Sequence, residues 1–297
     1  MKINVVLHPD HYSCFDAVHL ETLFLNYFNC VRYDPLTSYD NRTLFIANVF
    51  KKDAWAEQLI ADGRKIIVDN LWETIDVAAH WKPAYILTCP NWFWYNESLW
   101  YSNIGYDHYI VDKTYSKLAF MPIHKVKPFR DRVVNKLDSY LDTFIYSYKE
   151  HKLPGDMQQN DNRWQRYFNP AWYNDTYFSL VVETFEKGPC FVTEKTFKPC
   201  AFRHPFMIYG QIGILEFIKK IGFVTYENLF DESYDQFEMS LRLEKIIDNI
   251  KQFTQTPYNA LTLEKIEHNH SRFFNRQVVT DRFVQEIINP LIEYAET

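Results

Sequence analysis

Residues 179–199 read Ser-Leu-Val-Val-Glu-Thr-Phe-Glu-Lys-Gly-Pro-Cys-Phe-Val-Thr-Glu-Lys-Thr-Phe-Lys-Pro. The apolar run that ends at Val182 predicts a buried strand, and Gly188-Pro189 predicts a turn after it. A helix is then expected to open at Thr193, with Glu194 in its first turn. This stretch therefore predicts a strand, a turn and a helix in succession, with charged side chains where the helix begins.

The chemistry expected at this junction follows from the helix start. The first backbone N–H groups of a helix have no partner inside it, so they favour a negatively charged ligand. Glu194 can accept hydrogen bonds from a ribose diol, while Lys195 and the helix start can bind a pyrophosphate. The alternative is an ordinary helix cap with solvated charges, which the spacing alone does not exclude.

Residues 182–195 resemble the donor-binding signature of the α1,3-fucosyltransferase-like glycosyltransferases, in which a Phe-Glu-Asn-Ser strand precedes a Tyr-Val-Thr-Glu-Lys helix start. The longer stretch 179–208 is similar to a phage-encoded branch. Thr184 stands nearest to the family asparagine, and the loop to Glu194 is one residue longer here. The resemblance implies a nucleotide-sugar donor held by Glu183, Thr184, Thr193, Glu194 and Lys195.

Short apolar runs alternate with amphipathic segments along the chain, which predicts parallel βαβ units. Strands are expected at residues 2–7, 43–49, 65–68, 84–88, 108–111, 143–146, 178–182 and 205–209. Helices are expected after Pro128 and at residues 15–28, 53–61, 212–221, 241–253 and 271–296. We predict an α/β fold, and the resemblance implies a GT-B-like architecture of two Rossmann-like domains whose parallel sheets face across a cleft.

The length of 297 residues fits two domains. We expect an N-terminal, acceptor-side Rossmann-like domain at residues 1–115 and a C-terminal domain that binds the nucleotide-sugar donor at 116–280. The stretch 113–121 is expected to cross between them. The last helix, 281–297, is a candidate to pack back on the first domain.

A second group of donor residues is expected near Pro128. Residues 130–137 have an arginine seven positions before a leucine. In the resembling family, an arginine so placed contacts the donor diphosphate. The resemblance implies Arg130 in this role, with Arg132 as second choice, because a guanidinium stabilises charge on a leaving nucleoside diphosphate. A solvated helix face is the alternative.

We expect neither a metal site nor a bound cofactor. No Asp-x-Asp pattern follows an expected strand. Transferases that hold the diphosphate through a divalent cation usually need such carboxylates. The only small molecule expected is the nucleoside-diphosphate-sugar itself, of the UDP or GDP type.

An inverting transfer needs a general base that takes the proton of the acceptor hydroxyl. In the resembling family this base is a glutamate in a loop after a strand of the first domain. Glu73, a few residues beyond the strand expected at 65–68, is its nearest counterpart here. Asp69, Glu97 and Asp10 are the other candidates.

Composition limits the possible partners and location. The net charge of −6 argues against general attraction to nucleic acid or anionic membrane, although a local basic groove remains compatible with it. No run of about 20 apolar residues occurs, so no membrane insertion is expected. We expect a cytoplasmic protein, in the host cytoplasm if phage-encoded, with its cysteines reduced.

Together these features predict a glycosyltransferase that moves a hexose or pentose to a hydroxyl group, with inversion and without a metal. One acceptor is a hydroxymethylated base in phage DNA, which would need a basic groove built from residues 113–136. The other is a glycan or lipopolysaccharide, which would need an aromatic-lined cleft around residues 92–100. A catalytically inactive protein that binds nucleotide-sugars is the third possibility.

Overall fold

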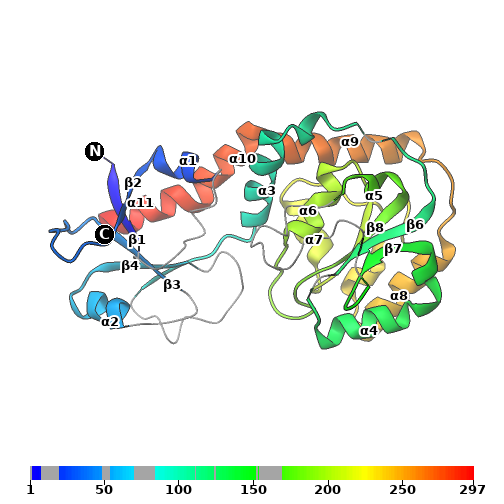
Figure 1. Ribbon diagram of the computed structural model, residues 1–297, viewed down its shortest axis with the longest axis horizontal. Coiled ribbons are helices and arrows are strands. Elements are labelled where there is room, and N and C mark those ends of the chain that lie inside the picture. Colours follow the sequence, from blue (N-terminus) through cyan, green and yellow to red (C-terminus); the bar gives the residue numbers. More distant parts are fainter. Residues whose placement is uncertain are drawn as a thin grey trace. The chain divides into compact units, whose positions relative to one another are not determined.

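The computed structural model describes residues 2–7, 20–48, 54–69, 84–110, 112–123, 125–151, 153 and 169–297. The chain forms two compact units, Met1–Trp100 with Arg276–Thr297 and Tyr101–Asn275 (Figure 1). Each unit contains its own parallel sheet. The expected fold class, α/β with parallel sheets, is confirmed.

The first sheet has the strand order β2-β1-β3-β4-β5, and neighbouring strands are parallel. Its strands are β1 (Ile3–Leu7), β2 (Phe28–Arg32), β3 (Leu44–Asn48), β4 (Lys65–Asp69) and β5 (Tyr85–Leu87). The described helices of this unit include α1 (Leu20–Leu25), α2 (Ala54–Ala61) and the beginning of α3 (Trp92–Asn103). Phe28 begins β2 and does not end the expected helix, because its backbone pairs with that of Ile3.

The C-terminal segment belongs to the first unit. It comprises α10 (Arg276–Phe283), the π-helical turn η5 (Val284–Ile288) and α11 (Asn289–Glu296). The ring of Tyr294 stacks on that of Tyr85 with centroids 5.0 Å apart, and the Lys65 ammonium donates to the carbonyl of Ala295. The end of α11 therefore packs on strands β4 and β5.

The second sheet has the order β7-β6-β8-β9, also parallel. Its strands are β6 (Lys117–Pro122), β7 (Phe144–Ser147), β8 (Thr176–Val182) and β9 (Phe206–Tyr209). The helices are α4 (Pro128–Lys136), α5 (Ala171–Asn174), α6 (Glu194–Ala201), α7 (Ile214–Lys220), α8 (Met239–Gln252) and α9 (Ala260–Phe274), with short turns η3 (Asp138–Thr143) and η4 (Glu232–Gln236).

The order of the second sheet determines where a ligand would bind. Going outward from β6, the chain first runs to β7 on one side and then crosses to β8 and β9 on the other. In open parallel sheets, ligands bind outside the carboxyl ends of the strands at such a reversal. The carboxyl ends of β6 and β8 are therefore the expected place, and all seven residues of β8 are buried beneath it.

Two expectations about the middle of the chain are wrong. Within the described residues, the stretch 108–111 contains no strand. It follows a single 3-10 turn, η2 (Tyr106–His108), which opens after Gly105 at φ 81°. The stretch 113–121, expected as a crossing, contains most of β6, which pairs with β8 as a central strand. At residues 117–121, pairing with β7 and β8 overrides the local pattern.

The aromatic stretch 92–100 is also different from the expectation. It forms most of α3, and its side chains from Trp92 to Leu99 are buried. Because both the apolar and the polar side chains of this stretch are buried, these rings pack inside the protein and do not line a surface cleft. Among the residues that the structure describes, no helix is both long and apolar enough to span a membrane.

Candidate functional site

Glu183 follows β8 directly and ties the strand to helix α6. Its fully buried carboxylate accepts hydrogen bonds from the backbone N–H of Thr193 at 3.0 Å and of Thr184 at 3.1 Å. The hydroxyls of Thr193 and Thr196 each donate to it at 2.6 Å. With its carboxylate occupied in this way, Glu183 holds the loop ends together and does not face a ligand.

Thr193 is the N-cap of α6, as the sequence predicts. Its backbone is extended, and its hydroxyl oxygen accepts from the backbone N–H of Lys195 at 3.4 Å. The Lys195 ammonium lies 3.1 Å from the same oxygen, 3.0 Å from Glu194 Oε1 and 3.4 Å from Thr184 Oγ1. Four of the predicted donor residues, Thr184, Thr193, Glu194 and Lys195, therefore meet at one point above the end of β8.

Glu194 is held as a carboxylate inside this group. Its side chain is only 5% exposed and forms an ion pair with Lys195. Burial alone would raise the pKa of Glu194, but the positive charges of Lys195 and Lys198 outweigh it and lower the pKa to about 2. Glu194 thus holds the Lys195 ammonium in place, and little of its own carboxylate is accessible to a ligand.

Arg130 reaches the same end of the sheet from α4. Its buried guanidinium donates to the carbonyls of Glu183 at 2.9 Å, Lys125 at 3.0 Å and Val182 at 3.4 Å. Burial lowers the pKa of Arg130, while Glu183 and Glu194 oppose that shift. The guanidinium therefore places a positive charge beneath the end of β8.

Lys127, which the sequence analysis did not single out, joins this site. Its ammonium donates to the carbonyl of Thr184 at 2.9 Å and lies 4.5 Å from the centre of the Phe185 ring. Lys127 directly precedes the proline that opens α4, so the sequence indicates its place at a helix start but not its contact with Thr184. Lys127, Arg130 and Lys195 thus bring three positive charges to the carboxyl ends of β6 and β8, where α4 and α6 also begin. We call this group the switch-point site.

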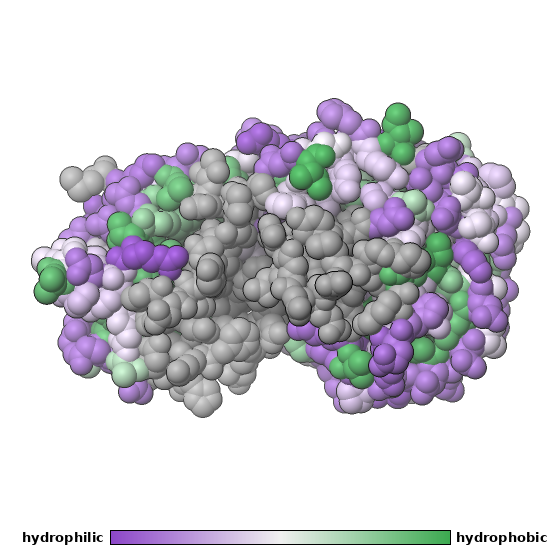
Figure 2. All heavy atoms as spheres, in the orientation of Figure 1, coloured by the Kyte–Doolittle hydropathy of each residue, from purple (hydrophilic) through white to green (hydrophobic). Residues whose placement is uncertain are grey.

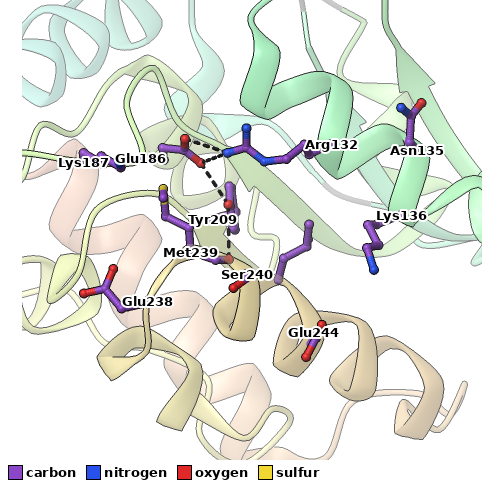
Figure 3. Close-up of a pocket in the computed structure, with 11 residues that line it drawn as sticks. Arg132, Asn135, Lys136, Glu186, Lys187, Tyr209, Glu238, Met239, Ser240 and Glu244 are labelled. Atoms are coloured by element: carbon purple, nitrogen blue, oxygen red, sulfur yellow. Dashed lines mark hydrogen bonds and ion pairs between the residues drawn. The ribbon is translucent and has the colours of Figure 1, made fainter.

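Arg132 points elsewhere. Its side chain is 51% exposed, and its guanidinium contacts both carboxylate oxygens of Glu186 at 2.7 Å. This pair borders a pocket of about 660 Å³ between α4, the loop after β8 and the start of α8 (Figure 3). The sequence pattern does not distinguish Arg130 from Arg132, but Arg130 contributes to the switch-point site and Arg132 borders this pocket.

Tyr209, the last residue of β9, lies within this pocket. Its hydroxyl donates to Glu186 at 3.1 Å and approaches the carbonyl of Met239 at 3.4 Å (Figure 3). Burial and the neighbouring Glu186 raise the pKa of Tyr209 to about 12, so the hydroxyl stays protonated as a donor. We call this space the Tyr209 pocket.

Of the four expected general bases, the structure describes the side chain of Glu97 alone. Glu73 and Asp10 lie outside the described residues, and so does the side chain of Asp69, the last residue of β4. Glu97 lies in α3 and is 2% exposed, with the Asn96 amide 3.3 Å from its carboxylate. The general base of a transfer therefore stays a prediction.

The basic segment 113–136 divides its charges between the interior and the surface. The Lys113 ammonium donates to the carbonyls of Tyr173 and Thr176, and burial keeps its pKa well below the usual value. Arg130 is buried as well, whereas Lys125 and Lys136 are exposed. Figure 2 shows hydrophobic residues dispersed among hydrophilic ones on the visible described surface of the second unit. Only part of the expected basic groove is thus available on the surface.

His204 is held by hydrogen bonds in the interior of the second unit. His204 is fully buried between Ser179 Oγ at 2.8 Å and the Thr176 carbonyl at 2.9 Å, and burial lowers its pKa well below the usual value.

Cys30, Cys89, Cys190 and Cys200 carry free thiols. Within the described ranges, no group of three histidine, cysteine or acidic side chains is placed to hold a metal ion.

Comparison with known protein structures identifies the fold of this chain. No family model and no curated protein matches the sequence. The structure resembles the crystal structure of an alpha1,3-fucosyltransferase, with a TM-score of 0.51, 11% sequence identity, and coverage of 94% of this chain and 92% of that one. The fold is GT-B-like. At this identity the likeness concerns the fold and not the activity.

A second similar structure is the DNA-modifying enzyme beta-glucosyltransferase, determined with and without uridine diphosphoglucose. Its TM-score is 0.48 at 10% identity, with 99% of this chain and 100% of that chain covered. The alpha1,3-fucosyltransferase with GDP-fucose gives a TM-score of 0.41 at 10% identity, covering 93% and 91% of the two chains. Scores below 0.5 support no conclusion about this chain.

Proposed function

We propose that this chain is a glycosyltransferase of the fucosyltransferase-like type, which moves a sugar from a nucleoside-diphosphate donor to a hydroxyl group. The observation that carries the proposal is the switch-point site. Lys127, Arg130 and Lys195 converge there with the starts of α4 and α6, at the strand ends where a GT-B-like fold can bind a nucleotide. The resemblance of residues 182–195 to a donor-binding signature supports the same assignment.

The proposed chemistry is a single displacement with inversion. The bond between the anomeric carbon and the diphosphate oxygen breaks while the acceptor oxygen bonds to that carbon. The electron pair stays on the leaving diphosphate, which Lys127 and Lys195 stabilise, and the acceptor proton passes to a carboxylate that acts as general base. Because these cations and helix starts supply the positive charge, we propose that the transfer needs no metal ion.

For the acceptor, we propose a hydroxymethylated base in DNA. This choice depends on the resemblance of residues 179–208 to phage-encoded transferases, and exposed Lys125 and Lys136 are compatible with it. A glycan acceptor loses its expected cleft, because the rings of residues 92–99 are buried. We expect mass spectrometry to show sugar transfer to a hydroxymethylated oligonucleotide and none to the same oligonucleotide without the hydroxymethyl group.

The donor part is tested by thermal unfolding with UDP or GDP, each with and without EDTA. A nucleotide present at 100 times its dissociation constant should add about 2.7 kcal/mol to the unfolding free energy. We expect one of the two to raise the melting temperature equally with and without EDTA. A stabilisation that disappears with EDTA would contradict metal independence, and no stabilisation at millimolar concentration would contradict the proposed function itself.

A further inference from the structure

The carboxylate of Glu183 accepts hydrogen bonds at both of its oxygens. Its Oε1 accepts from the backbone N–H of Thr193 at 3.0 Å and from the hydroxyl of Thr196 at 2.6 Å. Its Oε2 accepts from the backbone N–H of Thr184 at 3.1 Å and from the hydroxyl of Thr193 at 2.6 Å. A carboxylate offers about four lone-pair sites and no donor, so these contacts use its whole capacity. The fully buried side chain is therefore held in one orientation.

The contact with Glu183 decides which way the Thr193 hydroxyl points. A hydroxyl has one hydrogen and two lone pairs, and a carboxylate only accepts, so the hydrogen goes to Glu183. The lone pairs are then left for Lys195, whose backbone N–H lies 3.4 Å from the hydroxyl oxygen and whose ammonium lies 3.1 Å from it. Without the carboxylate, the same hydroxyl could turn its hydrogen toward the ammonium and repel it.

Thr184 carries the influence of Glu183 to a second cation. Its backbone N–H donates to Glu183, which holds this part of the loop in place. Its carbonyl accepts from Lys127 at 2.9 Å, and its hydroxyl oxygen lies 3.4 Å from the Lys195 ammonium. Arg130 donates to the carbonyl of Glu183 itself at 2.9 Å. Each cation of the switch-point site thus contacts either Glu183 or a threonine that Glu183 holds.

The Lys195 ammonium can meet a phosphate oxygen without losing the partners that hold it. Its three hydrogens have acceptors at 3.0 Å in Glu194, 3.1 Å in Thr193 and 3.4 Å in Thr184. The contact with Thr184 is the longest and therefore the weakest, so it is the one that a phosphate oxygen replaces. The ion pair with Glu194 and the contact with Thr193 then stay in place and aim the ammonium.

We propose that Glu183 is the positioning residue of the switch-point site. It touches no ligand, and it acts through Thr193 and Thr184 to aim Lys195 and Lys127 at the diphosphate of the donor. This inference rests on the proposed function, because that function supplies the diphosphate. A cation held in place before binding loses less side-chain freedom when a phosphate arrives, so the contribution of Glu183 should appear in ligand affinity as well as in stability.

Two threonines of α6 and its cap provide a matched test. Thr193→Val and Thr196→Val each remove a hydroxyl that donates to Glu183 at 2.6 Å, but of these two hydroxyls it is that of Thr193 that also contacts Lys195. Thr193→Ser keeps the hydroxyl. The probe is whichever of UDP or GDP binds the wild-type protein, titrated by calorimetry, and thermal unfolding measures the stability of each variant.

We expect Thr193→Val to raise the dissociation constant of the nucleotide about fivefold or more, and Thr196→Val and Thr193→Ser to change it less than about twofold. Both valine variants should lower the melting temperature, because each removes a buried hydrogen bond. Unchanged affinity in Thr193→Val, or equal losses of affinity in the two valine variants, would overturn this inference and leave the proposed function intact. A wild-type protein that binds neither nucleotide would instead overturn the proposed function.

Glu183→Gln tests the carboxylate directly. Its amide nitrogen donates, so it opposes groups that now donate to the carboxylate. We expect the dissociation constant of the nucleotide to rise about tenfold or more, and Glu183→Gln combined with Thr193→Val to bind within about twofold of Glu183→Gln alone. Losses that multiply in the double variant would show that Glu183 does not act through Thr193. The threonine variants carry the test by themselves if Glu183→Gln does not fold.

Discussion

At the carboxyl end of the second sheet, arginine and glutamate side chains have different roles in the switch-point site and in the Tyr209 pocket. At the switch-point site, Arg130, Glu183 and Glu194 are buried and bonded mainly to the protein itself. At the Tyr209 pocket, Arg132 and Glu186 face open space. The motif residues therefore build a rigid frame that orients a few cations, whereas the less conspicuous loop and helix residues provide open space for a ligand.

The largest expected difference between the site and the pocket concerns stability. Arg130→Met leaves the carbonyls of Val182, Glu183 and Lys125 without this donor, and the first two of these hydrogen bonds are buried, so we expect a loss of roughly 2–4 kcal/mol in the free energy of unfolding. Arg132→Met removes a surface ion pair and should cost less than about 1 kcal/mol. Urea unfolding of both variants measures the difference, and equal losses would show that the site and the pocket are not distinct in this way.

A smaller difference concerns the pH dependence of stability. The pKa of Glu194 is about 2 in the folded protein, against 4.5 for the free group, so the unfolded state binds a proton first as pH falls. The resulting stabilisation is complete above pH 4.5 and is lost as pH falls toward 2. We expect the gap in unfolding free energy between wild type and Glu194→Gln to shrink over that range. A gap that stays constant between pH 6 and pH 3 would contradict a lowered pKa.

The sequence predicts the frame because its signals are local. Thr193 is recognisable as a helix cap, and an unbroken apolar run marks β8. Lys127 and Glu186 were missed because their contacts join segments far apart in the chain, 57 residues for Lys127 and Thr184 and 54 for Arg132 and Glu186. Before folding, both look like ordinary surface charges.

The misread elements have a related cause. Helix α3 has its polar residues in one consecutive run, Asn96 to Ser98, and is buried on every side, so it lacks the one-sided apolar stripe that marks a helix in sequence. β2 begins at Phe28, which also continues the helical spacing of Leu20, Phe24 and Tyr27, and only pairing with β1 decides between the two structures. In each case contacts with distant parts of the chain determine which of the locally possible secondary structures forms.

The central claim is that the switch-point site binds the diphosphate of a nucleotide donor, and the most direct test is nucleotide binding by Lys195→Ala. Lys219→Ala is the matched control, because Lys219 forms an ion pair with Glu232 beyond β9. By titration calorimetry, we predict that Lys195→Ala raises the dissociation constant of UDP or GDP about tenfold or more, equal to about 1.4 kcal/mol, while Lys219→Ala leaves it unchanged. Equal affinity in wild type and Lys195→Ala would contradict the assignment of this site.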